Sequence, residues 1–205
     1  MKTDWNNYYS KKRSLISIIT QKITKRYLRR NLKEVSSDFP KAIELGGANS
    51  DFVTFFNTEY QVKEYDIIDN SKIGLGKTSG VNKIINFNLT NNTDSIKELF
   101  GKYDLVVSFG LIEHFEGSTL KTIIDNHFLL CKTSGYILIT FPTPTLQYRI
   151  TRVIMERLNI WAFHDEKPIL YNQVRTIFEK HGSVIFEGIN YLLPLSQQVV
   201  LIKKN

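Results

Sequence analysis

The sequence has almost no cysteine and no long apolar run, and each shortage excludes a class of protein. The single cysteine, Cys131, rules out a disulfide framework within the chain, and a reducing, cytoplasmic setting is the simplest interpretation. No run of about 18 apolar residues occurs, so we expect no membrane-spanning helix. We also expect no signal peptide, because no suitable apolar core follows the first basic cluster at residues 11–13. A chain of 205 residues can fold as one domain without disulfide bonds.

Excess positive charge is confined to the start of the chain. The net charge is +7, and the first 40 residues hold 10 lysines and arginines against 3 acidic residues, whereas the other 165 residues hold 17 of each. The balanced body argues against a large nucleic-acid footprint, which needs basic residues gathered on one face. The basic arm is the feature that keeps an anionic partner open.

Residues 1–36 are predicted to form this basic helical arm, ahead of a main domain at 37–205. Apolar residues recur every four positions from Leu15 to Tyr27, which predicts an amphipathic helix with a basic opposite face. The first interpretation is a solvated helix packed on the domain. A lid over the active site, a membrane-surface helix and a contact for an anionic substrate stay open. Three aromatic residues precede the helix and are interpreted as packing residues that a lid would also use: Trp5, Tyr8 and Tyr9.

The stretch at residues 41–52 carries the first functional signal. A short apolar run reaches an acid, Glu44, and then two glycines, Gly46 and Gly47. This order predicts a strand, a tight turn and a helix start, the place where open α/β sheets bind ligands. Glycine permits positive φ and close approach of a ligand. A phosphate-binding loop would be expected to have a lysine and unpaired backbone N–H groups here. A carboxylate beside the turn instead suits a cationic ligand.

Polar side chains also end the next two predicted strands. The strand at 61–68 leads to Asp69, with Asp66 as an alternative acid, and the strand at 81–87 leads to Asn88. The Gly-Lys pair at 76–77 resembles the end of a nucleotide phosphate loop, but Ser71 stands where that loop needs a glycine. We therefore interpret residues 74–78 as a loop without a phosphate site.

The second functional signal follows a predicted strand at 105–107, where Ser108 and Phe109 lead to the pair Glu113-His114. The remaining pattern predicts a helix at 51–57 and another at 120–131. A strand then ends at Pro142, and a helix at 171–181 ends at Gly182 as a left-handed cap. A last strand pair is predicted at 183–187 and 197–203. Alternating strands and helices predict a mainly parallel sheet.

Together these motifs resemble the class I S-adenosylmethionine-dependent methyltransferases. Glu44 and Gly46 match their first motif, with Ala48 and Ser50 where further glycines usually stand, and residues 108–115 resemble their motif after the fourth strand. The resemblance covers about residues 40–142 by motif and extends to 205 by the order of elements. It implies an α/β, Rossmann-like three-layer sandwich. Its seven-stranded sheet would be mostly parallel, with the last strand antiparallel.

The same resemblance implies S-adenosyl-L-methionine as cofactor and S-adenosyl-L-homocysteine as product. An acid after the second strand would bind the ribose hydroxyls, Asn88 the adenine amino group, and the residues after the fourth strand the methionine part. The cofactor-binding residues that it implies are Glu44, Gly46, Gly47, Ala48, Asp69, Asn70, Asn88, Leu89, Ser108 and Phe109. For Asn88, a simple turn asparagine is an equal alternative.

Histidine is the best candidate for a general base in this chain, if the acceptor is a hydroxyl. His114 comes first because the resemblance places it at the mouth of the site, and His164 is second. A structural histidine is the competing interpretation for His114. No cluster in the sequence has convincing metal-ligand spacing, so we predict no metal.

The acceptor is the least determined part of the prediction. An insertion at about 145–168 is expected to face the site and set substrate choice. We expect O-methylation of a small polar acceptor, sugar-like or phosphorylated, such as a precursor of a surface polysaccharide. The Asp-Pro-Pro-Tyr signature of amino-methylating nucleic-acid enzymes is absent after the fourth strand. A nucleic-acid or lipid-like acceptor, a peripheral membrane contact through the N-terminal helix, and a non-catalytic cofactor-binding scaffold stay as alternatives.

Overall fold

A computed structural model describes residues 3–32, 39–191 and 195–205. Seven strands form one sheet in the order β3-β2-β1-β4-β5-β7-β6. β7 pairs antiparallel with both β5 and β6, and the other neighbouring strands pair in parallel. This confirms the predicted sheet. The strands are β1 (Lys41–Leu45), β2 (Glu64–Asp69), β3 (Lys83–Asn86), β4 (Tyr103–Phe109), β5 (Cys131–Pro142), β6 (Gly182–Asn190) and β7 (Gln197–Lys204).

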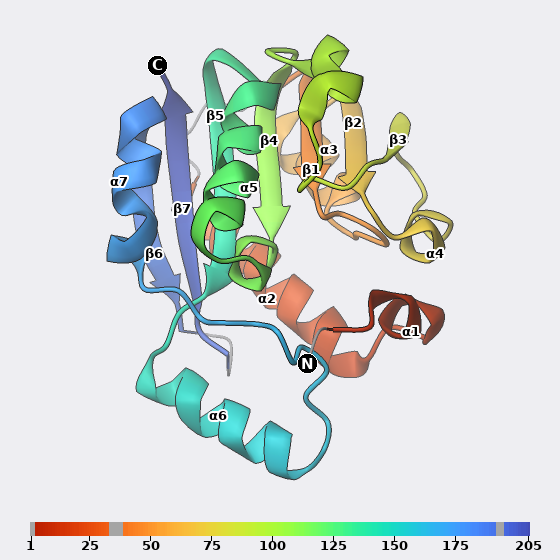
Figure 1. Ribbon diagram of the computed structural model, residues 1–205, viewed down its shortest axis with the longest axis vertical. Helices are drawn as coiled ribbons and strands as arrows, with labels where there is room; N and C mark the ends of the chain where they lie inside the picture. The colour runs from red at the N-terminus through yellow and green to blue at the C-terminus, as the bar shows by residue number, and fades with distance from the viewer. Residues whose placement is uncertain (1–2, 33–38, 192–194) are drawn as a thin grey trace.

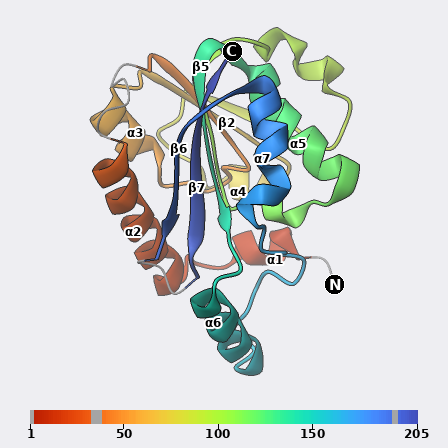
Figure 2. The ribbon, with the colours of Figure 1, turned by 90° about the vertical axis from the view of Figure 1, so that its left-hand side faces the viewer.

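Helices cover both faces of the sheet, which makes three layers (Figures 1 and 2). α5 and α7 lie on one face, with Phe128 and Phe178 in the core there, and α2 and α3 lie on the other, with Leu28 and Phe56. The central strands are buried on both sides, which explains their continuous apolar runs. The helices are α1 (Trp5–Ser10), α2 (Leu15–Asn31), α3 (Val53–Tyr60), α4 (Lys72–Leu75), α5 (Gly117–Leu130), α6 (Leu146–Arg157) and α7 (Tyr171–His181), with 3₁₀ turns at Thr93–Leu99 and Ile112–His114.

The carboxyl ends of the parallel strands meet at one end of the molecule. In Figure 1 the arrowhead of β4 points to this end, and α1, α4 and α6 lie beyond it. Because side chains that follow neighbouring parallel strands come together there, this end is where a ligand site is expected.

The N-terminal arm packs differently from the prediction. Its buried side chains in α2 are Thr24 and Leu28, in the second half of the helix. Leu15 and Ile19, which begin the predicted apolar stripe, are 77% and 54% exposed. The helix therefore touches the sheet with its later turns only, where Thr24 Oγ1 donates to Gln197 Oε1 at 3.1 Å. The predicted domain boundary at 36/37 lies outside the described residues.

We expect Leu28→Ala to destabilise the protein by about 2–5 kcal/mol, because it opens a cavity in a fully buried contact. Leu15→Ala removes the same atoms from an exposed side chain, so we expect a change within about 0.5 kcal/mol. Urea unfolding of both variants measures the difference. Equal losses would show that the whole length of α2 is buried in solution.

Three local predictions are wrong in detail. The helix predicted at 51–57 begins at Val53 and continues to Tyr60. Residues 72–75 form a helical turn where a loop was predicted, because Ser71 Oγ caps it by accepting from Gly74 N at 3.1 Å. α7 does end at Gly182, but this glycine has extended backbone and begins β6. It is needed there because a Cβ would lie 2.5 Å from Lys203 O.

Candidate active site

The turn after β1 is shaped so that only glycine fits at two positions. Gly46 has φ +69°, and a Cβ there would lie 2.8 Å from Leu111 Cδ1. A Cβ on Gly47 would lie 2.7 Å from Glu44 Cγ. The Glu44 side chain therefore folds back under its own turn.

Glu44 is an acid held in a desolvated position. Its side chain is 3% exposed, and Tyr65 Oη donates to its Oε2 at 2.8 Å. Burial raises the pKa of Glu44 to about 7, against the opposing hydrogen bonds from Ser50 and Tyr65. A buried carboxylate that carries its charge only above neutral pH would gain from a cationic ligand beside it.

We expect Glu44→Gln to remove a pH-dependent loss of stability. Because the pKa of Glu44 is raised by folding, its contribution to stability is present at low pH and is lost as pH rises from about 4.5 to about 7. The glutamine variant should equal the parent protein at pH 5 and have the higher melting temperature at pH 8. Thermal unfolding at the two pH values tests this, and identical pH dependence would contradict the burial of the charge.

Asp69 is the acid at the tip of β2, beside the turn after β1. Its Oδ2 accepts from Ala48 N at 3.1 Å and its Oδ1 from Ser71 N at 2.7 Å. Burial raises its pKa, and these backbone hydrogen bonds oppose the rise. Each carboxylate oxygen keeps one further lone pair for a ligand hydroxyl. The alternative acid, Asp66, lies inside β2, is 2% exposed and accepts from Tyr103 Oη at 2.8 Å, which favours Asp69.

The residues that follow β2 and β3 differ in what their side chains can offer a ligand. Asn70 is exposed, and its carbonyl accepts from Asn86 Nδ2 at 3.1 Å. Asn88 Oδ1 accepts from Thr90 N at 3.0 Å and from Thr90 Oγ1 at 2.9 Å, the geometry of a turn asparagine. Leu89 is buried. An adenine contact from the Asn88 side chain would have to displace Thr90.

The residues at the end of β4 are tied into the core. Ser108 is fully buried, and its Oγ lies 2.9 Å from Nε2 of His127 in α5. Phe109 stacks on Phe52, with ring centroids 3.7 Å apart and planes 6° from parallel. The Ser108 side chain therefore serves the packing of α5, and a contact with the cofactor would come from its backbone.

His114 forms a hydrogen-bonded pair that the sequence did not reveal. Its Nδ1 lies 3.0 Å from Asp165 Oδ1, and Thr3 Oγ1 donates to the same oxygen. Burial lowers the pKa of His114, and the charge of Asp165 opposes this. Trp5 covers the ring edge-on at 5.0 Å between centroids. No motif signals the pair, because 51 residues separate its members.

The other histidine candidate, His164, is exposed. It lines a surface hollow at the end of α6, with Glu156, Asn159 and Trp161. Its neighbour in the chain, Asp165, is the residue that the fold directs to His114. Among the described residues, His114, and not His164, has a hydrogen-bonded carboxylate partner of the kind that orients a general base.

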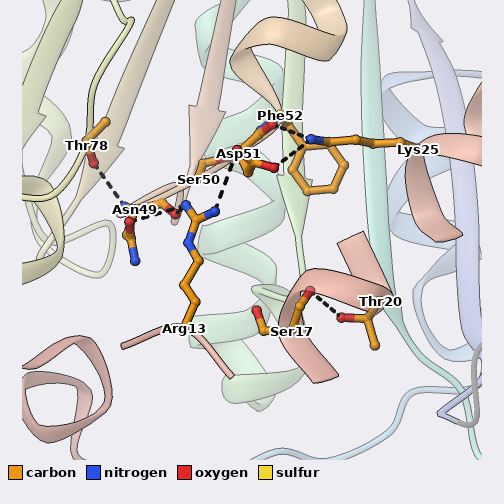
Figure 3. Close-up of polar contacts among 9 residues, drawn as sticks. All are labelled: Arg13, Ser17, Thr20, Lys25, Asn49, Ser50, Asp51, Phe52 and Thr78. Carbon is orange, nitrogen blue, oxygen red and sulfur yellow. Dashed lines mark hydrogen bonds and ion pairs between the residues drawn. The ribbon is translucent and has the colours of Figure 1, made fainter. Parts of the chain in front are cut away.

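The arm reaches the loop that follows the turn, as Figure 3 shows. Arg13 Nη2 donates to the carbonyl of Asn49 and lies 3.2 Å from its Oδ1, and Thr78 Oγ1 accepts from Asn49 N at 2.9 Å. Lys25 Nζ lies 2.9 Å from Asp51 Oδ2 and 5.3 Å from the centre of the Phe52 ring. Basic residues of the arm therefore hold residues 49–52 in place.

α1 closes over the same region. The ring of Tyr9 lies so near α4 that a Cβ on Gly74 would be 3.0 Å from it and 2.7 Å from Ala48 Cβ. Lys77 Nζ donates to the carbonyls that end α1, including that of Ser10 at 3.1 Å. Burial, then the charge of Asp69, raises the pKa of Tyr9. α1 thus covers the tip of β2, the position expected of a lid.

Three side chains with metal-binding donors, His114 among them, lie close together. A carboxylate oxygen of Glu113, one of Glu166 and a ring nitrogen of His114 are all within 4.8 Å of one another. Burial raises the pKa of Glu166 to about 7, and the charge of Asp165 adds to this rise. Burial, then the charge of Glu166, raises the pKa of Glu113 well above its usual range. Both shifts favour a protonated pair over two charges that attract a cation. The absence of a metal stays a prediction.

Comparisons with known proteins agree with this arrangement. The family model for a methyltransferase domain matches residues 20–187. Similar solved structures include PH0226 protein from Pyrococcus horikoshii OT3 (TM-score 0.67, 14% identity, covering 92% of each chain). They also include magnesium protoporphyrin IX methyltransferase ChlM from Synechocystis PCC 6803 with bound S-adenosylhomocysteine (TM-score 0.65, 13% identity, 98% of this chain and 93% of that one). A third is the N-methyltransferase NodS from Bradyrhizobium japonicum WM9 in complex with S-adenosylhomocysteine (TM-score 0.61, 13% identity, 93% and 88%).

No curated protein sequence matches this chain. The family match nevertheless spans most of the chain, and the seven-stranded sheet with its last strand antiparallel is the sheet that the sequence resemblance implied. On these grounds the chain belongs to the methyltransferase domain family and has the Rossmann-like fold of the class I methyltransferases.

Proposed function

We propose that this chain transfers a methyl group from S-adenosyl-L-methionine to a hydroxyl group of a small polar acceptor. The observation that carries the proposal is the contact between the turn after β1 and the tip of β2. There Asp69 accepts a hydrogen bond from Ala48 N and still has lone pairs free for a ligand. Two of the similar structures hold S-adenosylhomocysteine, the product that such a transfer would leave.

The residues on both sides of this contact fit the cofactor. Asp69 would accept hydrogen bonds from two ribose hydroxyls, since a carboxylate is an acceptor only. The buried Glu44 lies under the turn and would stabilise the positive charge of the methionine part. The cofactor supplies an electrophilic methyl group on sulfur, and the protein supplies position and electrostatics. Alignment alone is worth roughly 7–11 kcal/mol.

His114 is the residue proposed to take the proton from the acceptor hydroxyl. A proton on Nδ1, donated to Asp165, would leave Nε2 as the free acceptor, which is the arrangement of an oriented general base. Burial holds its pKa below the ordinary value, so the ring is neutral and ready to accept a proton at pH 7.

A sugar-like or phosphorylated acceptor agrees with the positive charge of the arm. The neutral body speaks against a nucleic-acid acceptor. A scaffold that binds the cofactor without turnover stays as the second candidate, because Asn88 is engaged with Thr90 and Ser108 with His127.

Isothermal titration with S-adenosylmethionine and with S-adenosylhomocysteine tests the first step of this proposal. We expect saturable binding of both, followed by labelled methyl transfer to a member of a panel of sugars, sugar phosphates and nucleotide sugars. Binding without transfer to any acceptor, including nucleic acids and lipids, would favour the scaffold. Absence of binding would overturn the proposed function.

A further inference from the structure

α6 presents an apolar face away from the domain. Its inner face is fixed, since Tyr148 Oη donates to Glu166 Oε1 at 2.6 Å and Arg152 Nη1 donates to Glu166 O at 2.9 Å. The opposite face carries large apolar side chains at helical spacing. Their exposed fractions are 75% for Leu146, 53% for Ile150, 47% for Val153, 52% for Ile154 and 62% for Leu158. Nothing in the described part of the chain covers them.

The first turns of α2 carry a second group of exposed apolar residues. Leu15, Ile16, Ile18 and Ile19 are 77%, 45%, 36% and 54% exposed. Figures 1 and 2 both place α6 beyond the strand tips, with the start of α2 toward the same end of the molecule. We call these two groups of exposed apolar residues, on α6 and at the start of α2, the apolar end. So many large exposed side chains at one end indicate an interaction surface.

Exposed cations lie on the same two helices and just before α2. Arg149 and Arg157 are exposed on α6, and four exposed basic residues lie before or along α2: Lys11, Lys12, Lys22 and Arg26. The acid Glu156 is paired with Arg152 at 2.8 Å and so offers little negative charge against them. Two copies of this chain that met through this end would bring like charges together, which disfavours a dimer. An anionic lipid surface offers acyl chains to the apolar residues and phosphates to the cations.

We propose that the apolar end docks this protein on the surface of an anionic membrane, with α6 lying in the headgroup region. The site opens at the same end of the sheet, beside α1. If the proposed methyl transfer holds, docking would present the site to acceptors carried on lipids, and the sugar-like acceptor would be one attached to a membrane lipid. That consequence for the acceptor rests on the proposed function, whereas the docking itself does not.

Vesicle co-sedimentation of the full chain tests the docking. We expect binding to phosphatidylcholine vesicles that contain phosphatidylglycerol, weaker binding at high salt, and little binding to pure phosphatidylcholine. Ile150→Glu should weaken binding about ten-fold, because it puts a charge in the apolar face. The matched control is Ile185→Glu on β6, where the side chain is 51% exposed against 53% for Ile150. Arg157→Glu should weaken binding to anionic vesicles without touching the apolar residues.

The outcomes separate docking from its competitors. No sedimentation of the parent chain, or equal loss in Ile150→Glu and Ile185→Glu, would overturn the proposal. Light scattering could instead show a dimer of the parent chain that Ile150→Glu converts to a monomer. If vesicle binding is then absent, the apolar end is an interface with a second copy of the chain, and the proposal is overturned. Titration with S-adenosylmethionine on the same samples keeps the proposals apart. Vesicle binding without cofactor binding would contradict only the proposed function. Cofactor binding without vesicle binding would contradict only the docking.

Discussion

The Asp69→Ala variant is expected to bind S-adenosylmethionine about 10- to 100-fold more weakly than the parent protein, because one or two hydrogen bonds to a charged group are lost. In the parent protein Asp69 also accepts hydrogen bonds from Ala48 N and Ser71 N. The variant loses both bonds, so the turn after β1 is held less firmly. Isothermal titration measures the affinity, and circular dichroism shows whether the fold persists.

The control for this experiment is the neighbouring acid. Asp66→Asn keeps an acceptor for Tyr103 Oη and removes only the charge, inside the strand. We expect its affinity for the cofactor to stay within about two-fold of the parent value, since the Asp66 side chain is buried inside the strand and bonded to Tyr103, away from the turn after β1. A result in which Asp66→Asn loses affinity and Asp69→Ala keeps it would assign the ribose contact to Asp66.

His114→Gln is expected to lower kcat by about 10²- to 10⁴-fold, the usual worth of a general base, with the affinity for the cofactor little changed. His164→Gln should leave kcat near the parent value, because His164 is exposed and no carboxylate in the described part of the chain is hydrogen-bonded to it as Asp165 is to His114. The measurement is methyl transfer to the acceptor found in the screen. A kcat that survives the loss of His114 would show that alignment alone suffices and that the histidine is structural.

The pH dependence of the same rate gives a second readout. Since a base must be neutral and burial lowers the pKa of His114, the acidic limb of kcat should lie at a lower pH than an ordinary histidine would give. Asp165→Asn removes the negative charge that raises this pKa, so the acidic limb should move to still lower pH. A limb that does not move in this variant would contradict the role of Asp165 as the positioning residue.

Local sequence order determined the frame of this protein. Strands that are buried on both faces are continuous apolar runs. The acid Glu44 lies near the end of one such run, β1, and the glycines follow it directly, so this motif is visible in consecutive residues. The predicted sheet and its antiparallel strand are confirmed for this reason. The placements of Glu44, Gly46, Gly47 and Asp69 followed in the same way, because carboxyl ends of parallel strands meet at one edge.

Only the tertiary structure decided which distant side chains meet. His114 finds Asp165 and Tyr9 comes to rest on α4 through contacts between segments that no local pattern links. The arm shows the limit most clearly. Its apolar stripe predicted a buried face, yet Leu15 is exposed and Thr24 is buried. A helical period says that a helix has two faces, but which turns find a partner depends on the shape of the sheet against which the helix packs.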